Sequence, residues 1–143
     1  MLVCDASLAV ELALDRIGEE ARNTFGDEEL VAPPLLWSEV PSVLHELVFR
    51  DAISDRLGDE ALERFTEGRL AIKERRHERL TSEAWRIATE LGWAKTYDAE
   101  YLATARLLKC RLVTFDMRLR RGAERLDLVV TPAELADEKQ AGT

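Results

Sequence analysis

The stretch "LVCDAS" at residues 2–7 decides the fold class. Its apolar run stops abruptly at Asp5 and leads into a predicted helix, and "LVTFD" at residues 112–116 stops in the same way at Asp116. Short apolar strands separated by helices are typical of a parallel sheet that is covered on both faces. In such sheets ligands bind at the carboxyl ends of the strands, where both carboxylates stand. For either aspartate alone, capping of the following helix is the simpler alternative.

The rest of the chain alternates strands and helices in the same manner. Apolar runs predict strands over residues 2–4, 29–32, 70–74 (the weakest), 112–115 and 126–130. Apolar residues at helical spacing predict helices over residues 7–14, 18–25, 35–50, 55–65, 82–91 and 97–109. Pro41 should kink or delay its helix. The capping box at 131–134 predicts a short last helix. We expect a single α/β domain over residues 1–136 and a loose tail over 137–143.

Length and composition are those of a soluble globular protein. The chain has 143 residues, of which 46% are apolar and 34% are charged, enough for one hydrophobic core. We see neither a signal peptide nor an apolar run of membrane-spanning length, and therefore expect a cytoplasmic protein. Cys4 and Cys110 lie in or beside apolar runs without CxxC spacing, so we expect reduced core cysteines rather than a metal site.

The charge of the chain is unevenly distributed. A net charge of −8 ordinarily counts against a nucleic-acid partner. Residues 106–125, however, contain seven Lys or Arg against two Asp or Glu. A basic strip beside acidic groups is compatible with a phosphate-bearing substrate that is held near metal ions. A solvated helix surface is the alternative interpretation.

Two further acids, Glu39 and Asp98, lie on predicted helices. On a helical projection Glu39 falls at the margin of the apolar stripe, and Asp98 shares the inward side of its helix with Leu102 and Ala105. An acid that favours the helix dipole after an N-cap at Thr96 is the alternative for Asp98. That alternative explains an exposed acid better than an inward-facing one. Because charges are rarely buried without a partner, a bound cation is the economical explanation.

The candidate ligands favour a hard divalent cation. Mg²⁺ and Mn²⁺ prefer carboxylate and water oxygens, whereas softer ions prefer sets of His or Cys. His45 and His77 lie far apart without ligand spacing. Acid clusters that hold Mg²⁺ most often serve phosphoryl chemistry. The motifs GxxxxGK, GxGxxG and GxSxG are missing, which weakens the NTPase, dinucleotide-binding and serine-hydrolase interpretations.

Four segments in order resemble the motifs of PIN-domain proteins, especially the VapC-type ribonuclease toxins: "VCDAS", "VAPPLLWSEV", "TYDAEYLATA" and "LVTFDMRL". The resemblance extends from Leu2 to about Leu135. It implies a three-layer α/β/α sandwich with a central parallel sheet of four to five strands. It also implies a Mg²⁺- or Mn²⁺-dependent endoribonuclease that a VapB-like antitoxin inhibits. We further expect a homodimer.

Carried over residue by residue, the resemblance implies an acidic quartet of Asp5, Glu39, Asp98 and Asp116. The hydroxyls of Ser7 and Thr114 match supporting positions. We expect the three aspartates to hold one metal ion, and Glu39 to bind a second or to orient the attacking water. The candidates for guiding the RNA backbone are Arg118, Arg120 and Arg121. Pro41, inside the helix of Glu39, departs from the family pattern.

Two other classes of function stay open at this point. One is a PIN-like nuclease of RNA processing that has no antitoxin. The other is an inactive module whose acidic pocket only receives a basic partner peptide. The presence of all four acids argues against the inactive module.

Overall fold

The computed structural model describes residues 1–142 and contains a five-stranded sheet in the order β3-β2-β1-β4-β5. All neighbouring strands are parallel, as predicted, and Val3 pairs with Val31 on one side and with Leu112 on the other. The strands are β1 (Leu2–Cys4), β2 (Leu30–Ala32), β3 (Ile72–Glu74), β4 (Arg111–Val113) and β5 (Val129–Val130). The chain builds outward from β1 to β3 on one side and from β4 to β5 on the other. The strand order therefore reverses between β1 and β4, which is where open parallel sheets bind ligands.

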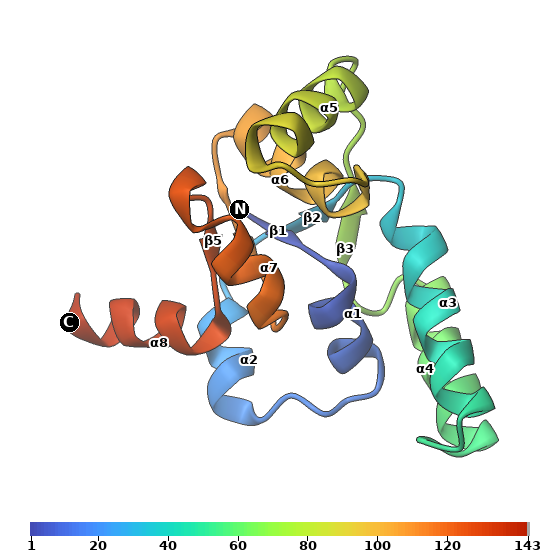
Figure 1. Cartoon of the computed structure of the whole chain (residues 1–143). Helices are drawn as coiled ribbons and strands as arrows, with labels where there is room; N and C mark the ends of the chain where they lie inside the picture. The colour runs from blue at the N-terminus through green and yellow to red at the C-terminus, as the bar shows by residue number, and fades with distance from the viewer. Residues whose placement is uncertain (143) are drawn as a thin grey trace.

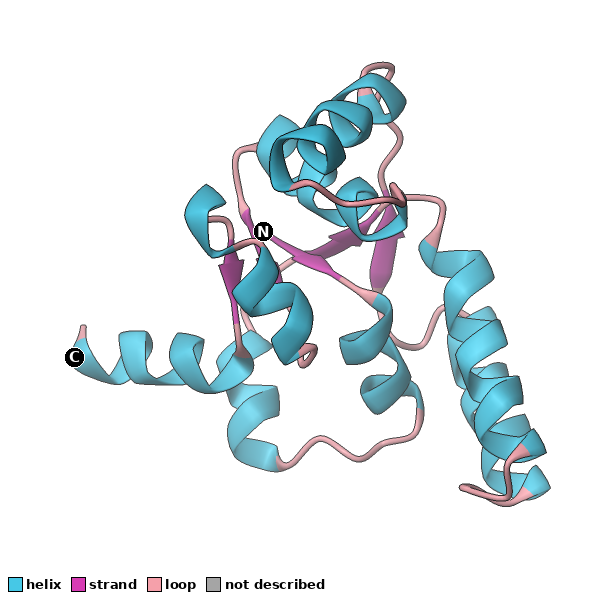
Figure 2. Ribbon diagram, in the orientation of Figure 1, coloured by secondary structure: helices cyan, strands magenta, loops and turns pink. Residues whose placement is uncertain are grey.

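Helices surround this sheet, so the expected α/β architecture with both faces covered is confirmed (Figure 2). They are α1 (Ala6–Ala13), α2 (Glu19–Phe25), α3 (Leu36–Phe49), α4 (Asp55–Thr66), α5 (Leu80–Leu91), α6 (Tyr97–Leu108), α7 (Met117–Gly122) and α8 (Pro132–Ala141). In Figure 1, α5 and α6 pack together above the sheet, α1 and α2 lie below it, and α3 and α4 run side by side. No helix within residues 1–142 has both the length and the apolar character that a membrane crossing requires.

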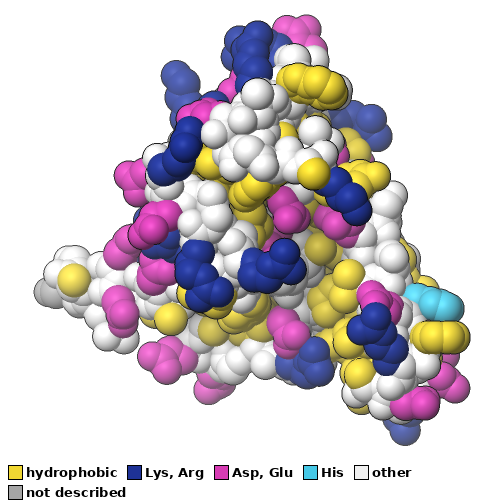
Figure 3. Space-filling view, viewed as in Figure 1, with side chains coloured by type: hydrophobic (Ala, Val, Ile, Leu, Met, Phe, Trp, Pro, Cys, Tyr) yellow, Lys and Arg dark blue, Asp and Glu magenta, His cyan; other side chains and the backbone are white. Residues whose placement is uncertain are grey.

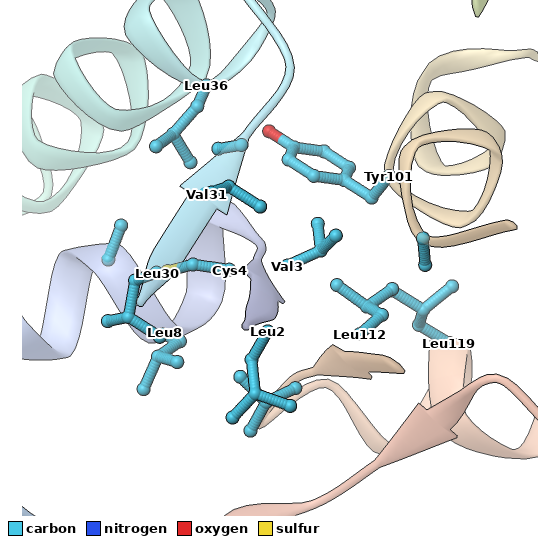
Figure 4. Close-up of a cluster of buried hydrophobic side chains, with 14 of the residues drawn as sticks. Leu2, Val3, Cys4, Leu8, Leu30, Val31, Leu36, Tyr101, Leu112 and Leu119 are labelled. Carbon is cyan, nitrogen blue, oxygen red and sulfur yellow. The ribbon is translucent and has the colours of Figure 1, made fainter. Parts of the chain in front are cut away.

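The core lies around the central strands. Val3, Val31 and Leu112 are fully buried, because helices cover both faces of the sheet at these positions (Figure 4). The edge strand β3 is different, since Lys73 and Glu74 are exposed, which explains the weak apolar signal of this segment. Both cysteines are free.

Three details differ from the sequence predictions. Helix α7 was not expected; it is short and places only Leu119 in the core, too little for a periodic signal. The last strand is confined to two residues, because a 3-10 helix (Glu124–Leu126) and Asp127 with φ of 53° precede it. Helix α3 begins at Leu36 and runs through Pro41, so the proline does not delay it.

The predicted loose tail is also wrong over residues 137–141, which continue α8. Long-range contacts explain the extension of this helix. Arg111 makes an ion pair with Glu138 at 2.7 Å, and the Lys139 Nζ donates a hydrogen bond to the carbonyl of Thr24. These partners are distant in sequence and left no local signal. Residue 143 of the predicted tail lies outside the described residues, and the boundary of the single domain at residue 136 stays a prediction.

Candidate active site

Asp5 stands at the carboxyl end of β1 and is also the N-cap of α1. Its Oδ1 accepts hydrogen bonds from the backbone N–H of Leu8 at 3.1 Å and from the hydroxyl of Ser7 at 2.7 Å. Its Oδ2 accepts the hydroxyl of Thr114. Only 4% of Asp5 is exposed. The two interpretations of this residue, helix cap and site acid, are therefore compatible.

The hydroxyls of Ser7 and Thr114 join the ends of β1 and β4. Each donates its hydrogen to Asp5, so each can still accept from the backbone. The N–H of Phe115 donates to the Ser7 Oγ at 3.0 Å, and the N–H of Asp116 donates to the Thr114 Oγ1 at 2.9 Å. The predicted supporting hydroxyls thus hold both Asp5 and the loop that carries Asp116.

Asp116 is the N-cap of α7 and is exposed. Its Oδ1 accepts from the N–H groups of Arg118 at 2.9 Å and Leu119 at 3.2 Å. No donor among residues 1–142 contacts its other oxygen. Capping therefore uses one oxygen of this carboxylate and leaves the second for a ligand.

Glu39, in the first turn of α3, is partly buried and has a partner that the sequence did not indicate. The hydroxyl of Tyr101 on α6 donates a hydrogen bond to its Oε1. The Tyr101 ring is 1% exposed and lies in the core, with its hydroxyl at the end of the ring nearest α3 (Figure 4). A buried tyrosine hydroxyl needs an acceptor, and this rule was the available signal for Tyr101.

Asp98 is the second residue of α6 and is exposed. The prediction that it faces the core is wrong in this respect, although it does lie on the inward side of its helix. The reason is its place at the first turn of α6, beside a pocket, where the inward direction leads to solvent instead of the core. The N-cap Thr96 makes no side-chain hydrogen bond to this helix end.

Burial raises the pKa of three of these acids. Burial raises the pKa of Asp5, the charge of Asp116 adds to this rise and the hydrogen bonds of Asp5 oppose it, so that the pKa is about 6. Burial also raises the pKa of Glu39, and the charge of Asp98 adds to this effect. Asp98 is exposed as a residue, but the pocket walls partly desolvate its carboxylate, and this desolvation and then the charge of Asp116 raise its pKa. Each acid thus senses the charge of a neighbour in the set.

The four acids line one pocket of about 240 Å³. Ser7 and Tyr101 line it too, so the structure brings together residues that come from four separate segments of the chain. A second pocket of about 510 Å³ shares Glu39, Asp98 and Asp116 with it. The site is therefore a continuous acidic depression at the carboxyl edge of the sheet.

The donor chemistry of this pocket fits a hard divalent cation, because its charged groups are carboxylates, some of them mutually repelling. Within residues 1–142, no three His, Cys, Asp or Glu side chains are already gathered as a formed metal site. The carboxylates therefore border the pocket without converging on one point. Their role as metal ligands stays a prediction.

The three predicted RNA-guiding arginines have different surroundings. Arg118 is exposed and lines the larger pocket, where its charge opposes the rise in the pKa of Asp98. Arg120 makes an ion pair with Glu134 at 3.0 Å, which fastens α7 to α8. Arg121 is exposed and has no ion-pair partner among the described residues. Figure 3 shows basic side chains beside acidic ones in the middle of one face of the molecule.

Solved structures that are similar to this chain include the following two. PAE2754 from Pyrobaculum aerophilum has a TM-score of 0.65 with 21% identity, over 98% of this chain and 95% of that one. A toxin–antitoxin complex from Klebsiella pneumoniae contains a chain with a TM-score of 0.64 and 17% identity, over 92% of this chain and 98% of that one. At these identities the two structures support the fold alone.

Sequence comparison is more specific. The VapC ribonuclease Mb0985 of Mycobacterium bovis is 38% identical over 119 residues, which are 83% of this chain and 88% of that protein. Ribonuclease VapC9 of Mycobacterium tuberculosis matches with the same identity and coverage. The family model described as the PIN domain matches residues 2–125. With the sheet order and the acidic pocket described above, these matches establish that the chain belongs to the PIN-domain family, among its VapC-type members.

Proposed function

We propose that this chain is a Mg²⁺- or Mn²⁺-dependent endoribonuclease and the toxin of a toxin–antitoxin pair. One observation carries the proposal: four acids from four segments of the chain border a single pocket at the carboxyl edge of the sheet. The relatives at 38% identity bear the name ribonuclease, and one structural neighbour is a toxin–antitoxin complex, which supports the same activity and partner.

In this proposal Asp5, Asp98 and Asp116 hold one divalent ion. A divalent ion held by these three carboxylates would lower the pKa of the attacking water and stabilise negative charge on the scissile phosphate. Asp5 is fixed in place by its three hydrogen bonds. Glu39 has one oxygen engaged by Tyr101, so its other oxygen is available to orient the attacking water or to bind a second ion.

The three arginines have different proposed roles in RNA binding. Arg118, at the rim of the larger pocket, contacts the phosphate next to the cleavage point. Arg121 is free to contact a more distant phosphate. Arg120 acts through its ion pair with Glu134, which fixes the position of α7 and therefore of Asp116 at its start.

The partner is an antitoxin of the VapB type. A segment of that protein with an Arg or Lys can enter among the carboxylates and compete with the metal ion. We expect co-purification with the product of a neighbouring reading frame to give an inactive complex. We also expect a homodimer, with its activity in the cytoplasm. A complex that cleaves RNA as fast as the free chain contradicts the toxin–antitoxin assignment and favours a processing nuclease without an antitoxin.

The test of the activity is cleavage of total RNA by the purified chain, followed by sequencing of the products. Mg²⁺ or Mn²⁺ should support cleavage at defined sites, and EDTA should abolish it. The double variant Asp98→Asn and Asp116→Asn, purified in the same way, controls for contaminating nuclease. Undiminished cleavage in EDTA overturns the mechanism. Binding of a basic peptide without any cleavage favours the inactive module.

A further inference from the structure

The three tryptophans of the chain lie in three different surroundings. Trp37 packs against Phe65 with 5.9 Å between the ring centroids and so contributes to the contact of α3 with α4. Trp85 is 70% exposed on α5, away from both pockets that the acids border. Trp93, in the loop between α5 and α6, lines the larger pocket together with three of the acids.

The local structure fixes Trp93 at the edge of this pocket. Gly92, with φ of 73°, ends α5 in the left-handed region, and the N–H of Trp93 then bonds to the carbonyl of Ala88 at 2.8 Å. The ring packs against Gly122 of α7, where a Cβ would lie 3.3 Å from the Trp93 Cζ2. The ring is thus partly buried at one edge, and its remaining surface borders the pocket.

Tyr97 provides a second aromatic ring in the same pocket. It is 56% exposed and its hydroxyl makes no hydrogen bond with any described residue, whereas Tyr101 on the same helix is buried and its hydroxyl bonds to Glu39. Tyr97 directly precedes Asp98. An open pocket that combines two aromatic rings with charged groups suits a ligand with one flat, apolar part and one charged part.

Two cations complete this pocket. Lys95 lies between the two aromatic residues in sequence, has no ion-pair partner among residues 1–142, and lines the pocket as Arg118 does. The volume of about 510 Å³ is within the range of small-ligand sites, roughly 300–1,000 Å³. The flat rings suit a base and the two cations suit a phosphate. The proposed site of metal-assisted hydrolysis adjoins both, so the pocket matches one nucleotide beside the cleaved bond.

We propose that Trp93 and Tyr97 form a stacking site for one unpaired base of the RNA, adjoining the phosphate that is cleaved. Lys95 and Arg118 contact the backbone of the same nucleotide. This inference rests on the proposed ribonuclease activity and specifies its substrate as single-stranded at that nucleotide, because bases inside a duplex cannot stack on protein side chains.

The test is a double-mutant cycle between the protein and its RNA. The probe is a short single-stranded RNA with one cleavage site, prepared intact and as a series in which one base at a time is removed. KM and kcat are measured with Mg²⁺, and affinity is measured in EDTA. For wild type, one abasic position should weaken binding by about tenfold. Trp93→Ala and Tyr97→Ala should weaken binding of intact RNA similarly and show no further loss at that position.

Two variants serve as controls. Tyr97→Phe keeps the ring and should retain the response to base removal. Trp85→Ala removes an exposed tryptophan outside the pocket and should behave as wild type. If Trp93→Ala unfolds, as circular dichroism would reveal, the exposed Tyr97 decides the question.

The outcomes separate the two proposals. Absence of RNA cleavage by wild type contradicts the ribonuclease activity, while the binding cycle in EDTA still tests the stacking site. If every abasic RNA weakens wild type and both alanine variants by the same factor, the stacking site is refuted whatever the activity. An equal effect of Trp85→Ala would likewise overturn it.

Discussion

The two sides of the acidic pocket are built differently. On one side Asp5 is buried, accepts three hydrogen bonds and joins β1 to β4 through two hydroxyls. On the other side Asp98 is exposed, and its carboxylate accepts no hydrogen bond from the described residues. The first carboxylate therefore has a structural role in addition to its proposed chemical role, whereas only the proposed chemical role is assigned to the second. Substitutions on the two sides should separate these roles.

The largest effect is expected from Asp98→Asn. The variant loses one proposed metal ligand, and with it part of the charge stabilisation that the metal ion would supply. We expect kcat/KM for RNA to fall by about 1,000-fold, which is the upper end of the range for loss of one charge-stabilising group. The thermal midpoint in EDTA should not fall, because Asp98 holds nothing in place. Mg²⁺ should raise the midpoint of wild type and have little effect on the variant. A destabilised variant with an unchanged response to Mg²⁺ would identify Asp98 as a structural residue.

Asp5 should make the metal-free protein less stable at neutral pH. Its pKa is raised from 3.8 to about 6, so the folded state binds more protons than the unfolded state between these values. Stability should therefore fall as pH rises from about 4 to about 6, and the full penalty is about 3 kcal/mol at pH 7. Urea unfolding in EDTA at pH 7 and at pH 4.5 measures most of this penalty.

The control for this pH dependence is Asp5→Asn, whose side chain does not titrate. Its unfolding free energy should change less between the two pH values than that of wild type. If both proteins show the same pH dependence, groups other than Asp5 cause the loss of stability as pH rises.

Gly58→Ala should lower stability without involving either side of the pocket. A Cβ at Gly58 on α4 would lie 2.4 Å from the Cγ2 of Val48 on α3. Val48 is β-branched and cannot easily turn aside, so the unfolding free energy should fall by about 1–3 kcal/mol. Below the melting transition kcat/KM should stay at the wild-type value. A loss of kcat/KM in proportion to the lost stability would contradict this separation of stability from activity.

The smallest effect is expected from Tyr101→Phe, which removes the donor to Glu39 and keeps the buried ring. By analogy with partners that orient metal ligands, kcat/KM should fall by about tenfold. The fall should be mainly in kcat, because Glu39 is proposed to orient the attacking water. Addition of Glu39→Gln to Tyr101→Phe should cause less loss than Glu39→Gln causes alone. Full additivity would show that the two residues act separately.

The strands beside the site could be predicted because their signal is local. An apolar run that ends in an acid marks β1 and β4, and the strand order then brings Asp5 and Asp116 together. Glu39 and Asp98 were found from helical periodicity. Periodicity shows which way a side chain points from its helix, but not whether core or solvent lies in that direction. For this reason the exposure of Asp98 was missed.

The features that were missed depend on partners far away in sequence. The bond of Tyr101 to Glu39 spans 62 residues, and the end of α8 is held by Arg111 and by the carbonyl of Thr24. Nothing in the neighbouring sequence announces such contacts. Helix α7 was missed for a different reason, since only Leu119 of this short helix is buried and one buried residue gives no periodic signal.

The hydroxyl bridge between β1 and β4 determines when, during synthesis of the chain, the pocket can be completed. The Thr114 hydroxyl bonds to Asp5 across 109 residues of chain, and Asp116 comes later still. The chain is synthesised from its N-terminus and a domain folds as a unit, so Asp5 and Glu39 emerge long before β4 exists to complete the pocket. A ribosome making this protein is therefore not exposed to a finished nuclease until most of the polypeptide has been translated.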